Sequence, residues 1–265
     1  MLIGYGQPVI TPTVAGGAAV NLQALVDGHP ASITRISGGA GSVSLRADWA
    51  EAVPVRIVAA LGLTCPAGTA LTLTGKRAGD PGYTYALGGN ASTQTVVQLP
   101  DGSRAAWFVL PAANTHLVGL QLAVAANAFD IGELVALQAV DVAHKIEWSV
   151  ERIDPSVSER TLGGGLNTVR RRSYRRLRVA FTPAGLAEVR GNGLANGMDW
   201  DSLTCAVAGS SRVAGIPRWH TPTGGVDAMN LHRTGLFGAV SPGAVGHLGG
   251  DYYESGWVFE EIPPV

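Results

Sequence analysis

The feature that most constrains the fold is a succession of short apolar or alternating runs separated by turn residues. The clearest are QTVVQL (94–99), AAWFVL (105–110) and HLVGLQLAV (116–124), with PDG and PAAN between them. Runs of this length, about ten residues apart, are typical of a β-sandwich or barrel rather than a parallel α/β sheet. The Asp-Gly pair at 101–102 favours a hairpin turn, because such turns need positive φ angles. We therefore predict a mainly all-β fold.

The pattern of apolar and charged residues changes near residue 140, and this change predicts two domains. Residues 1–140 are expected to form a β-sandwich of the jelly-roll or carbohydrate-binding-module kind. Residues 141–265 are expected to form a second β-rich domain, similar to a barrel or sandwich. Its first strand would lie in HKIEWSVERI (144–153), where alternation puts Ile146, Trp148 and Val150 on one face.

One short helix is predicted in the second domain, near residues 183–191. In TPAGLAEVRGNGL (182–194), Thr182 suits the N-cap, and Gly191 and Gly193 provide the end of the helix. The final run, ESGWVFEEI (254–262), alternates as a strand does.

The composition favours a protein whose surface is partly covered by neighbours. Charged residues make up only 15% of the chain, and glycine occurs 36 times. So few charged residues leave little charged surface to keep a single subunit soluble as a monomer. No basic segment followed by an apolar core opens the chain, and no apolar run is long enough to cross a bilayer. We therefore expect synthesis in the cytoplasm and no membrane insertion.

The sequence contains no motif that predicts an enzyme. It lacks the nucleophile elbow, the P-loop, the dinucleotide fingerprint and the HExxH zinc motif. Asp199 and Asp201 in MDWDS lack the further ligands of a calcium loop and are interpreted as loop residues. The two cysteines, Cys65 and Cys205, are expected to be buried thiols. We predict no catalytic residues, no metal site and no cofactor.

Several tryptophans leave carbohydrate binding open. Trp107, Trp148 and Trp257 lie in alternating runs and are expected in the core. Trp200, Trp219 and the neighbouring His220 fall outside the predicted strands, where an aromatic face can stack on a sugar ring. These three residues are the candidate glycan contacts.

The most unusual segment is RRRSYRRLRVAF (170–181), which places six arginines in nine positions of a chain whose net charge is only -1. Strand alternation puts Leu177, Val179 and Phe181 on one, inward face. The arginines before them cannot be buried unpaired, because desolvation costs several kcal/mol per ion. Nucleic-acid binding would need a basic domain with interleaved aromatics, which this chain does not have.

Two interpretations of the arginines stay open. They pair with acidic strands of the same sheet, EWSVERID and VFEEI, or they contact a neighbouring copy. On the second interpretation, the subunit contact consists of Arg170, Arg171, Arg172, Arg175, Arg176, Glu260 and Glu261. Reversing the charge of Arg171 and Arg175 together would then prevent assembly and leave the monomer folded.

The chain resembles structural proteins of the tail tip, or baseplate, of long non-contractile-tailed bacteriophages. The resemblance rests on GYGQPVITPT, CPAGTALTLTG, LPDGSRAAWFVLP, HKIEWSVERID, the arginine run with TPAGLAEV, and the terminal WVFEEI. It implies a minor tail protein, similar to the distal-tail type, although the sandwich here comes first. Such a protein would form a ring with copies of itself and would link the tail tube to the hub and fibres of the virion.

The predicted function is therefore that of a structural component of a phage tail tip, with no enzymatic activity and no nucleic-acid partner. The alternative is a carbohydrate-binding or receptor-binding module of a virion or bacterial surface.

Overall fold

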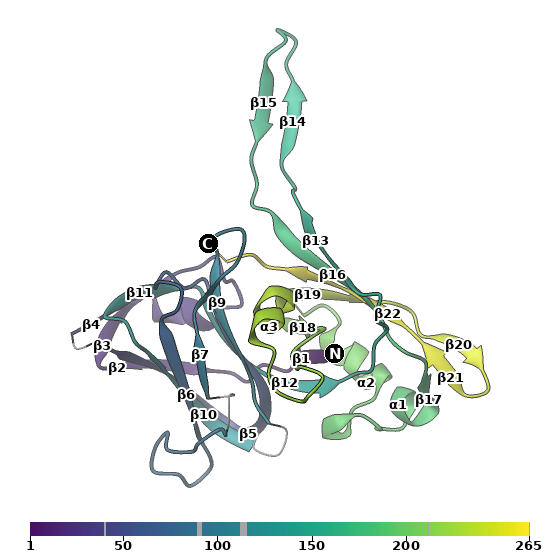
Figure 1. The fold of residues 1–265 in the computed structure, drawn as a ribbon, viewed down its shortest axis with the longest axis horizontal. Helices are drawn as coiled ribbons and strands as arrows, with labels where there is room; N and C mark the ends of the chain where they lie inside the picture. Colours follow the sequence, from purple (N-terminus) through teal and green to yellow (C-terminus); the bar gives the residue numbers. More distant parts are fainter. Residues whose placement is uncertain (40, 89–91, 112–115, 211, 265) are drawn as a thin grey trace.

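Figure 1 shows a computed structural model, which describes residues 1–39, 41–88, 92–111, 116–210 and 212–264. The fold is mainly β, as predicted, and its sheets are antiparallel. The strands of the first half are β1 (Leu2–Tyr5), β2 (Thr11–Ala15), β3 (Gly17–Val20), β4 (Thr34–Gly38), β5 (Val43–Leu61), β6 (Ala70–Lys76), β7 (Thr93–Thr95), β8 (Val97–Gln98), β9 (Arg104–Val109), β10 (His116–Val124), β11 (Ala128–Ile131) and β12 (Glu133–Asp141).

The second half combines strands with short helices. Its strands are β13 (Ser149–Ile153), β14 (Val157–Arg160), β15 (Leu166–Val169), β16 (Tyr174–Ala180), β17 (Ala184–Gly185), β18 (Val213–Ile216), β19 (Leu236–Pro242), β20 (Gly246–Gly249), β21 (Tyr252–Glu254) and β22 (Gly256–Glu261). Its α-helices are α1 (Leu186–Arg190), α2 (Trp200–Val207) and α3 (Ala228–Thr234), and 3-10 turns occur at η1 (Leu22–Val26) and η4 (Ala195–Gly197).

The long strand β5 builds the first core by taking part in two layers. Its first part pairs with β2 and β10, and its last part pairs with β12 and β9. Apolar side chains that alternate along both parts, such as Leu45, Ala47, Val58 and Ala60, are fully buried between the layers. The predicted Asp-Gly hairpin is confirmed: the N–H of Gly102 donates to the carbonyl of Leu99 at 2.9 Å, and the φ of Gly102 is +85°.

Backbone hydrogen bonds continue across residue 140, where two domains were predicted to meet. Strand β1 lies between β12 and β18, so the order β13-β16-β22-β19-β18-β1-β12-β5 forms one continuous path. The shared strands are buried on both faces. On the second face, α3 covers them with Leu231, and Trp107 and Phe237 are 1% and 2% exposed.

The strand that carries the arginines follows the predicted alternation. Leu177, Val179 and Phe181 are 0%, 4% and 1% exposed and pack in the core of the second half. The predicted strand at 144–153 begins later, at Ser149. Ile146 lies before this strand and is 93% exposed, whereas Trp148 and Val150, predicted on the same face as Ile146, are half-buried against the core.

The helices differ most from the prediction. The expected helix near 183–191 is shortened to α1, which begins after Gly185, because Ala184 and Gly185 pair with β21. Asp199 lies not in a loop but at the N-cap of α2, where its side chain accepts from the N–H of Ser202 at 2.8 Å. Cys65 is buried as expected, whereas Cys205, on α2, is exposed.

Candidate functional site

The most distinctive surface is a two-stranded arm that continues β13 and β16 away from the body. Figure 1 shows β14 and β15 projecting clear of both halves of the molecule. Val157 lies opposite Val169, and Arg160 lies opposite Leu166. At the tip, the N–H of Thr161 donates to Gly165 O at 2.8 Å, and Gly164 adopts a φ of +81°. The glycine-rich run at 163–165 thus forms the turn of a hairpin.

The arm carries apolar side chains that the body does not cover. Val157, Leu162, Leu166 and Val169 are 45%, 112%, 68% and 52% exposed. A two-stranded ribbon by itself is marginally stable in water. It also leaves its outer backbone groups free to pair with another chain. The arm (residues 157–169) therefore exposes both apolar side chains and backbone groups that are able to pair with another strand.

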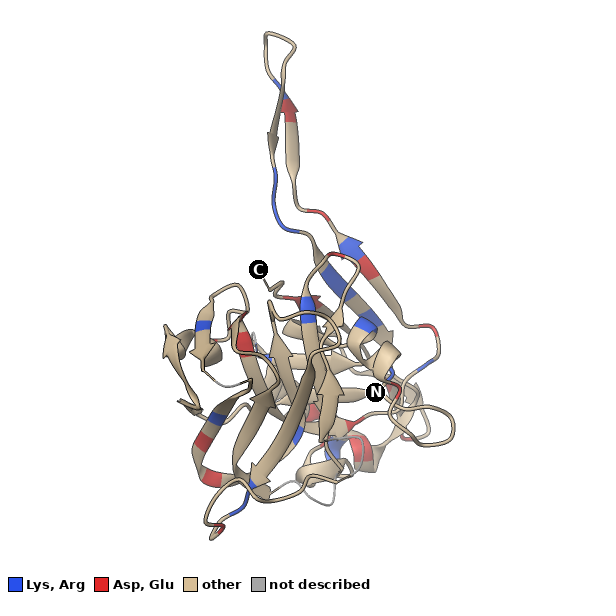
Figure 2. Cartoon of the chain, turned by 60° about the vertical axis from the view of Figure 1, so that its left-hand side comes forward, with Lys and Arg blue, Asp and Glu red and all other residues tan. Residues whose placement is uncertain are grey.

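Three of the predicted interface arginines lie at the base of the arm. Arg170, Arg171 and Arg172 are exposed, and their side chains make no ion pair with the residues that the structure describes. Their backbone is held in place, since the N–H of Arg171 donates to Ser156 Oγ at 2.9 Å. Figure 2 shows the basic segment where the arm meets the body. These adjacent positive charges favour an acidic or anionic neighbour.

Arg175 and Glu261 instead pair with each other inside the chain. Their side chains are 9% and 8% exposed, and Arg175 Nε donates to the carboxylate of Glu261 at 3.0 Å. The guanidinium also donates to the carbonyls of Arg233, at 2.9 Å, and Gly235, at 3.1 Å. This pair ties β16 and β22 to the end of α3, so neither side chain is free to bind a neighbour.

Arg176 and Glu260 are likewise partners within the sheet. They lie opposite each other in the register of β16 and β22, and Arg176 Nη2 lies 2.7 Å from Glu260 Oε1. On the other side, Glu151 of β13 pairs with Arg176 at 3.5 Å and with Arg178 at 3.1 Å. The body end of the arginine segment therefore follows the first interpretation, pairing with acidic strands of the same sheet.

Of the candidate glycan contacts, Trp200 is placed where no sugar can reach it. It is 2% exposed and packs on Phe181, with ring centroids 5.5 Å apart. Trp219 is half-buried beside the exposed His220, with ring centroids 4.6 Å apart. The guanidinium of Arg56 lies 5.6 Å from the centre of the Trp219 ring. Only Trp219 and His220 keep the surface position that the hypothesis requires.

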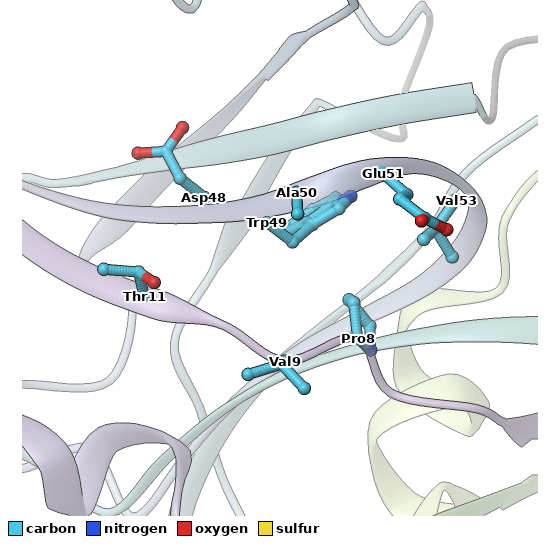
Figure 3. Close-up of a pocket in the computed structure, with 8 residues that line it drawn as sticks. All are labelled: Pro8, Val9, Thr11, Asp48, Trp49, Ala50, Glu51 and Val53. Atoms are coloured by element: carbon cyan, nitrogen blue, oxygen red, sulfur yellow. The ribbon is translucent and has the colours of Figure 1, made fainter.

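A groove on the sandwich, which the sequence did not reveal, forms a second candidate surface. It has a volume of about 670 Å³ and lies where β5 bends, between residues 48–53 and the segment before β2 (Figure 3). Val9 is 91% exposed at its edge. Trp49 also lines the groove, although its indole is largely buried. Its Nε1 donates a hydrogen bond to the carbonyl of Leu117 at 2.6 Å, which fixes the ring.

Two carboxylates lie at this groove, one bound by neighbouring side chains and the other exposed and unpaired. Asp48 accepts from the hydroxyl of Tyr83 and lies 3.7 Å from Lys76. Burial raises the pKa of Tyr83, and the hydrogen bond to Asp48 raises it further, so the hydroxyl stays protonated. Glu51 is exposed and has no ion-pair partner among the described residues. The groove therefore offers an apolar edge next to one free negative charge.

Two buried titratable groups lie away from both surfaces. Burial raises the pKa of Glu133 to about 8, and its Oε2 accepts from the N–H of Gly28 at 3.0 Å. Burial lowers the pKa of His232. His232 Nε2 accepts from the N–H of Trp107 at 3.0 Å. Nδ1 lies 2.6 Å from Ala228 O. This arrangement requires a neutral ring that donates through Nδ1.

Within the described ranges, no group of three or more His, Cys, Asp or Glu side chains is arranged to hold a metal ion. No helix in the same ranges is long and apolar enough to span a membrane.

Comparisons with known proteins give limited similarity. No family model and no curated protein matches the sequence. Among solved structures, the module CpGH89CBM32-6 of Clostridium perfringens is 11% identical, with a TM-score of 0.36, and the match covers 48% of this chain and 93% of that one. A family 89 glycoside hydrolase of the same organism, in complex with 2-acetamido-1,2-dideoxynojirmycin, is 12% identical with a TM-score of 0.33, and 14% of its chain is covered. Similarity at this level assigns no function, and the comparisons place the chain in no family.

Proposed function

We propose that this protein is a non-enzymatic structural subunit that assembles with copies of itself through the arm. The observation that carries the proposal is a hairpin with four exposed apolar side chains (Val157, Leu162, Leu166 and Val169) above three unpaired arginines. Apolar surface and unpaired strand edges of this kind are stabilised when another chain covers them. The low charge of the whole chain supports the same conclusion.

Within this function, we propose the tail tip of a long-tailed bacteriophage as the site of assembly. The support is the sequence resemblance to tail-tip proteins, together with the arm. An arm that docks on a different surface of the next copy makes a heterologous contact, which generates a ring when the rotation closes. Antibody labelling of virions in negative-stain electron microscopy tests the location. Label at one end of the tail supports it, and virions without label contradict it.

The assembly itself is tested by removing the arm. In the test variant, residues 158–168 are replaced by a two-residue Asn-Gly turn, and the mass in solution is measured by light scattering after gel filtration. We expect the intact chain to form oligomers and the variant to remain a folded monomer with unchanged circular dichroism.

A matched control removes exposed apolar side chains elsewhere. Leu248→Ser with Tyr252→Ser changes the β20–β21 hairpin, whose side chains at these positions are 51% and 56% exposed. This control should assemble as the intact chain does. Oligomers of equal size from the armless variant would contradict the proposal.

Carbohydrate binding is the second candidate function. It is favoured by the pair formed by Trp219 and His220, since Trp219 is partly exposed and is flanked by the cationic Arg56. An amphipathic ring at the surface, held by neighbours, suits stacking on a sugar. A glycan array tests this function: saturable binding that Trp219→Ala removes supports it, and no binding by the intact chain contradicts it.

A further inference from the structure

The arm needs an acceptor surface, and the described part of its own chain offers none within reach. β14 and β15 point away from the body in both Figure 1 and Figure 2. Leu162, at the tip, is 112% exposed and so touches nothing. The acceptor must therefore lie on another molecule. If the proposed function is correct, on which this inference rests, that molecule is a second copy of the chain.

The tip presents a defined chemistry to its acceptor. Arg160 and Leu166 are direct register partners, so both side chains lie on the same face of the ribbon. Leu162 follows two residues after Arg160, at the turn. Glu159 and Asn167 face the other way. The tip thus combines Arg160 and Leu166 on one face with Leu162 at the turn, and Arg160 has no ion-pair partner among the described side chains.

The groove at the bend of β5 has the complementary chemistry. Its edge is apolar, with Pro8, Val9 and Val53, and Glu51 supplies a free carboxylate beside them (Figure 3). A volume of about 670 Å³ holds on the order of 20 waters. Filling it with leucine side chains would therefore release water from apolar surface.

A second hollow, at the base of the arm, is a poorer match. It has a volume of about 300 Å³, and most of the charges in its lining are already paired: Arg152 with Asp101, Arg175 with Glu261, and Glu151 with Arg176 and Arg178. The remaining charge is Arg233, which has no ion-pair partner among the described residues and repels the arginine of the tip. Of these two hollows, the groove on the sandwich is the one whose charge suits the arm.

We propose that the groove between Val9 and Glu51 receives the arm tip of a neighbouring copy. Leu162 and Leu166 cover Val9 and Val53, and Arg160 pairs with Glu51. The two surfaces are different parts of the chain, so each copy donates one arm and accepts one. The contact is heterologous and continues from copy to copy.

Cysteine cross-linking tests the contact. Val9→Cys and Leu162→Cys are made separately in a Cys205→Ser background, which removes the exposed native thiol. The two variants are mixed and oxidised. We expect a disulfide-linked dimer from the mixture and little from either variant alone. The matched control mixes Leu162→Cys with Leu248→Cys, an exposed position outside the groove, and should give no dimer.

Charge exchange gives a second test that does not depend on oxidation. Glu51→Arg should weaken self-association about tenfold, and so should Arg160→Glu. The double variant should recover most of the loss, because the ion pair is restored in reverse. Absence of both the cross-link and the recovery overturns the groove as acceptor.

The outcomes separate this inference from the proposed function. If the armless variant is monomeric while Val9 and Glu51 variants assemble normally, the arm drives assembly but docks elsewhere. If the intact chain is monomeric at every concentration measured, both the proposed function and the proposed acceptor groove are wrong.

Discussion

Replacing Arg175 should destabilise the fold strongly, although it lies in a run of arginines that looks like a solvated surface. In Arg175→Met, the carboxylate of Glu261, 8% exposed, keeps its charge and loses its buried partner. The carbonyls of Arg233 and Gly235 also lose a donor. Breaking a buried ion pair on one side typically costs about 3–5 kcal/mol. For a chain of this size, that cost lowers the melting temperature by roughly 6–20 °C.

Urea unfolding followed by tryptophan fluorescence measures the effect. The matched control is Arg176→Met, in the next position of the same strand. Its ion pair with Glu260 is partly exposed, and pairs in contact with water contribute little. Arg175→Met combined with Glu261→Leu should recover part of the loss, since no buried charge is left unpaired. Equal, small effects of Arg175→Met and Arg176→Met would refute the buried pair.

Three further predictions concern single groups in the body. Burial lowers the pKa of His232 below 6.5, so on acidification the unfolded chain binds a proton at this residue before the folded chain does. The free energy of unfolding should therefore fall as the pH drops below about 6.5. His232→Gln should weaken this pH dependence, as measured by urea titrations. Burial raises the pKa of Glu133 from 4.5 to about 8, so stability should instead fall as the pH rises through that window, and Glu133→Gln should flatten the decline. Asp199→Ala removes the cap of α2 and should cost about 1 kcal/mol, whereas Asp199→Ser should retain most of the stability in the same assay.

The strand framework was predictable from the sequence because alternation and turn residues report local geometry. The burial of Leu177, Val179 and Phe181 follows from a period of two, and the turn at Gly102 follows from its need for a positive φ. The sequence also carries a start signal for α2. Asp199 and Ser202 form a reciprocal capping box, a known start signal for helices.

Other features depend on contacts between distant segments, which no local pattern reports. The buried partner of Arg175 is 86 residues away, so the sequence left two interpretations of the arginines open. The structure pairs Arg175, Arg176 and Arg178 with acidic side chains of the same sheet. It leaves Arg170, Arg171 and Arg172 exposed and without an ion-pair partner among the described residues. Charge reversal at Arg175 would therefore damage the fold itself, and that residue is unsuited to the assembly test expected from the sequence.

The measurement that tests the central claim most directly is hydrogen exchange of the arm as a function of protein concentration. In the isolated subunit the backbone of β14 and β15 is an exposed ribbon, whose amides should exchange quickly. If copies assemble through the arm, peptides covering 157–169 should become protected at the concentrations where the mass in solution rises. Fast exchange of those peptides in the assembled state would contradict the account.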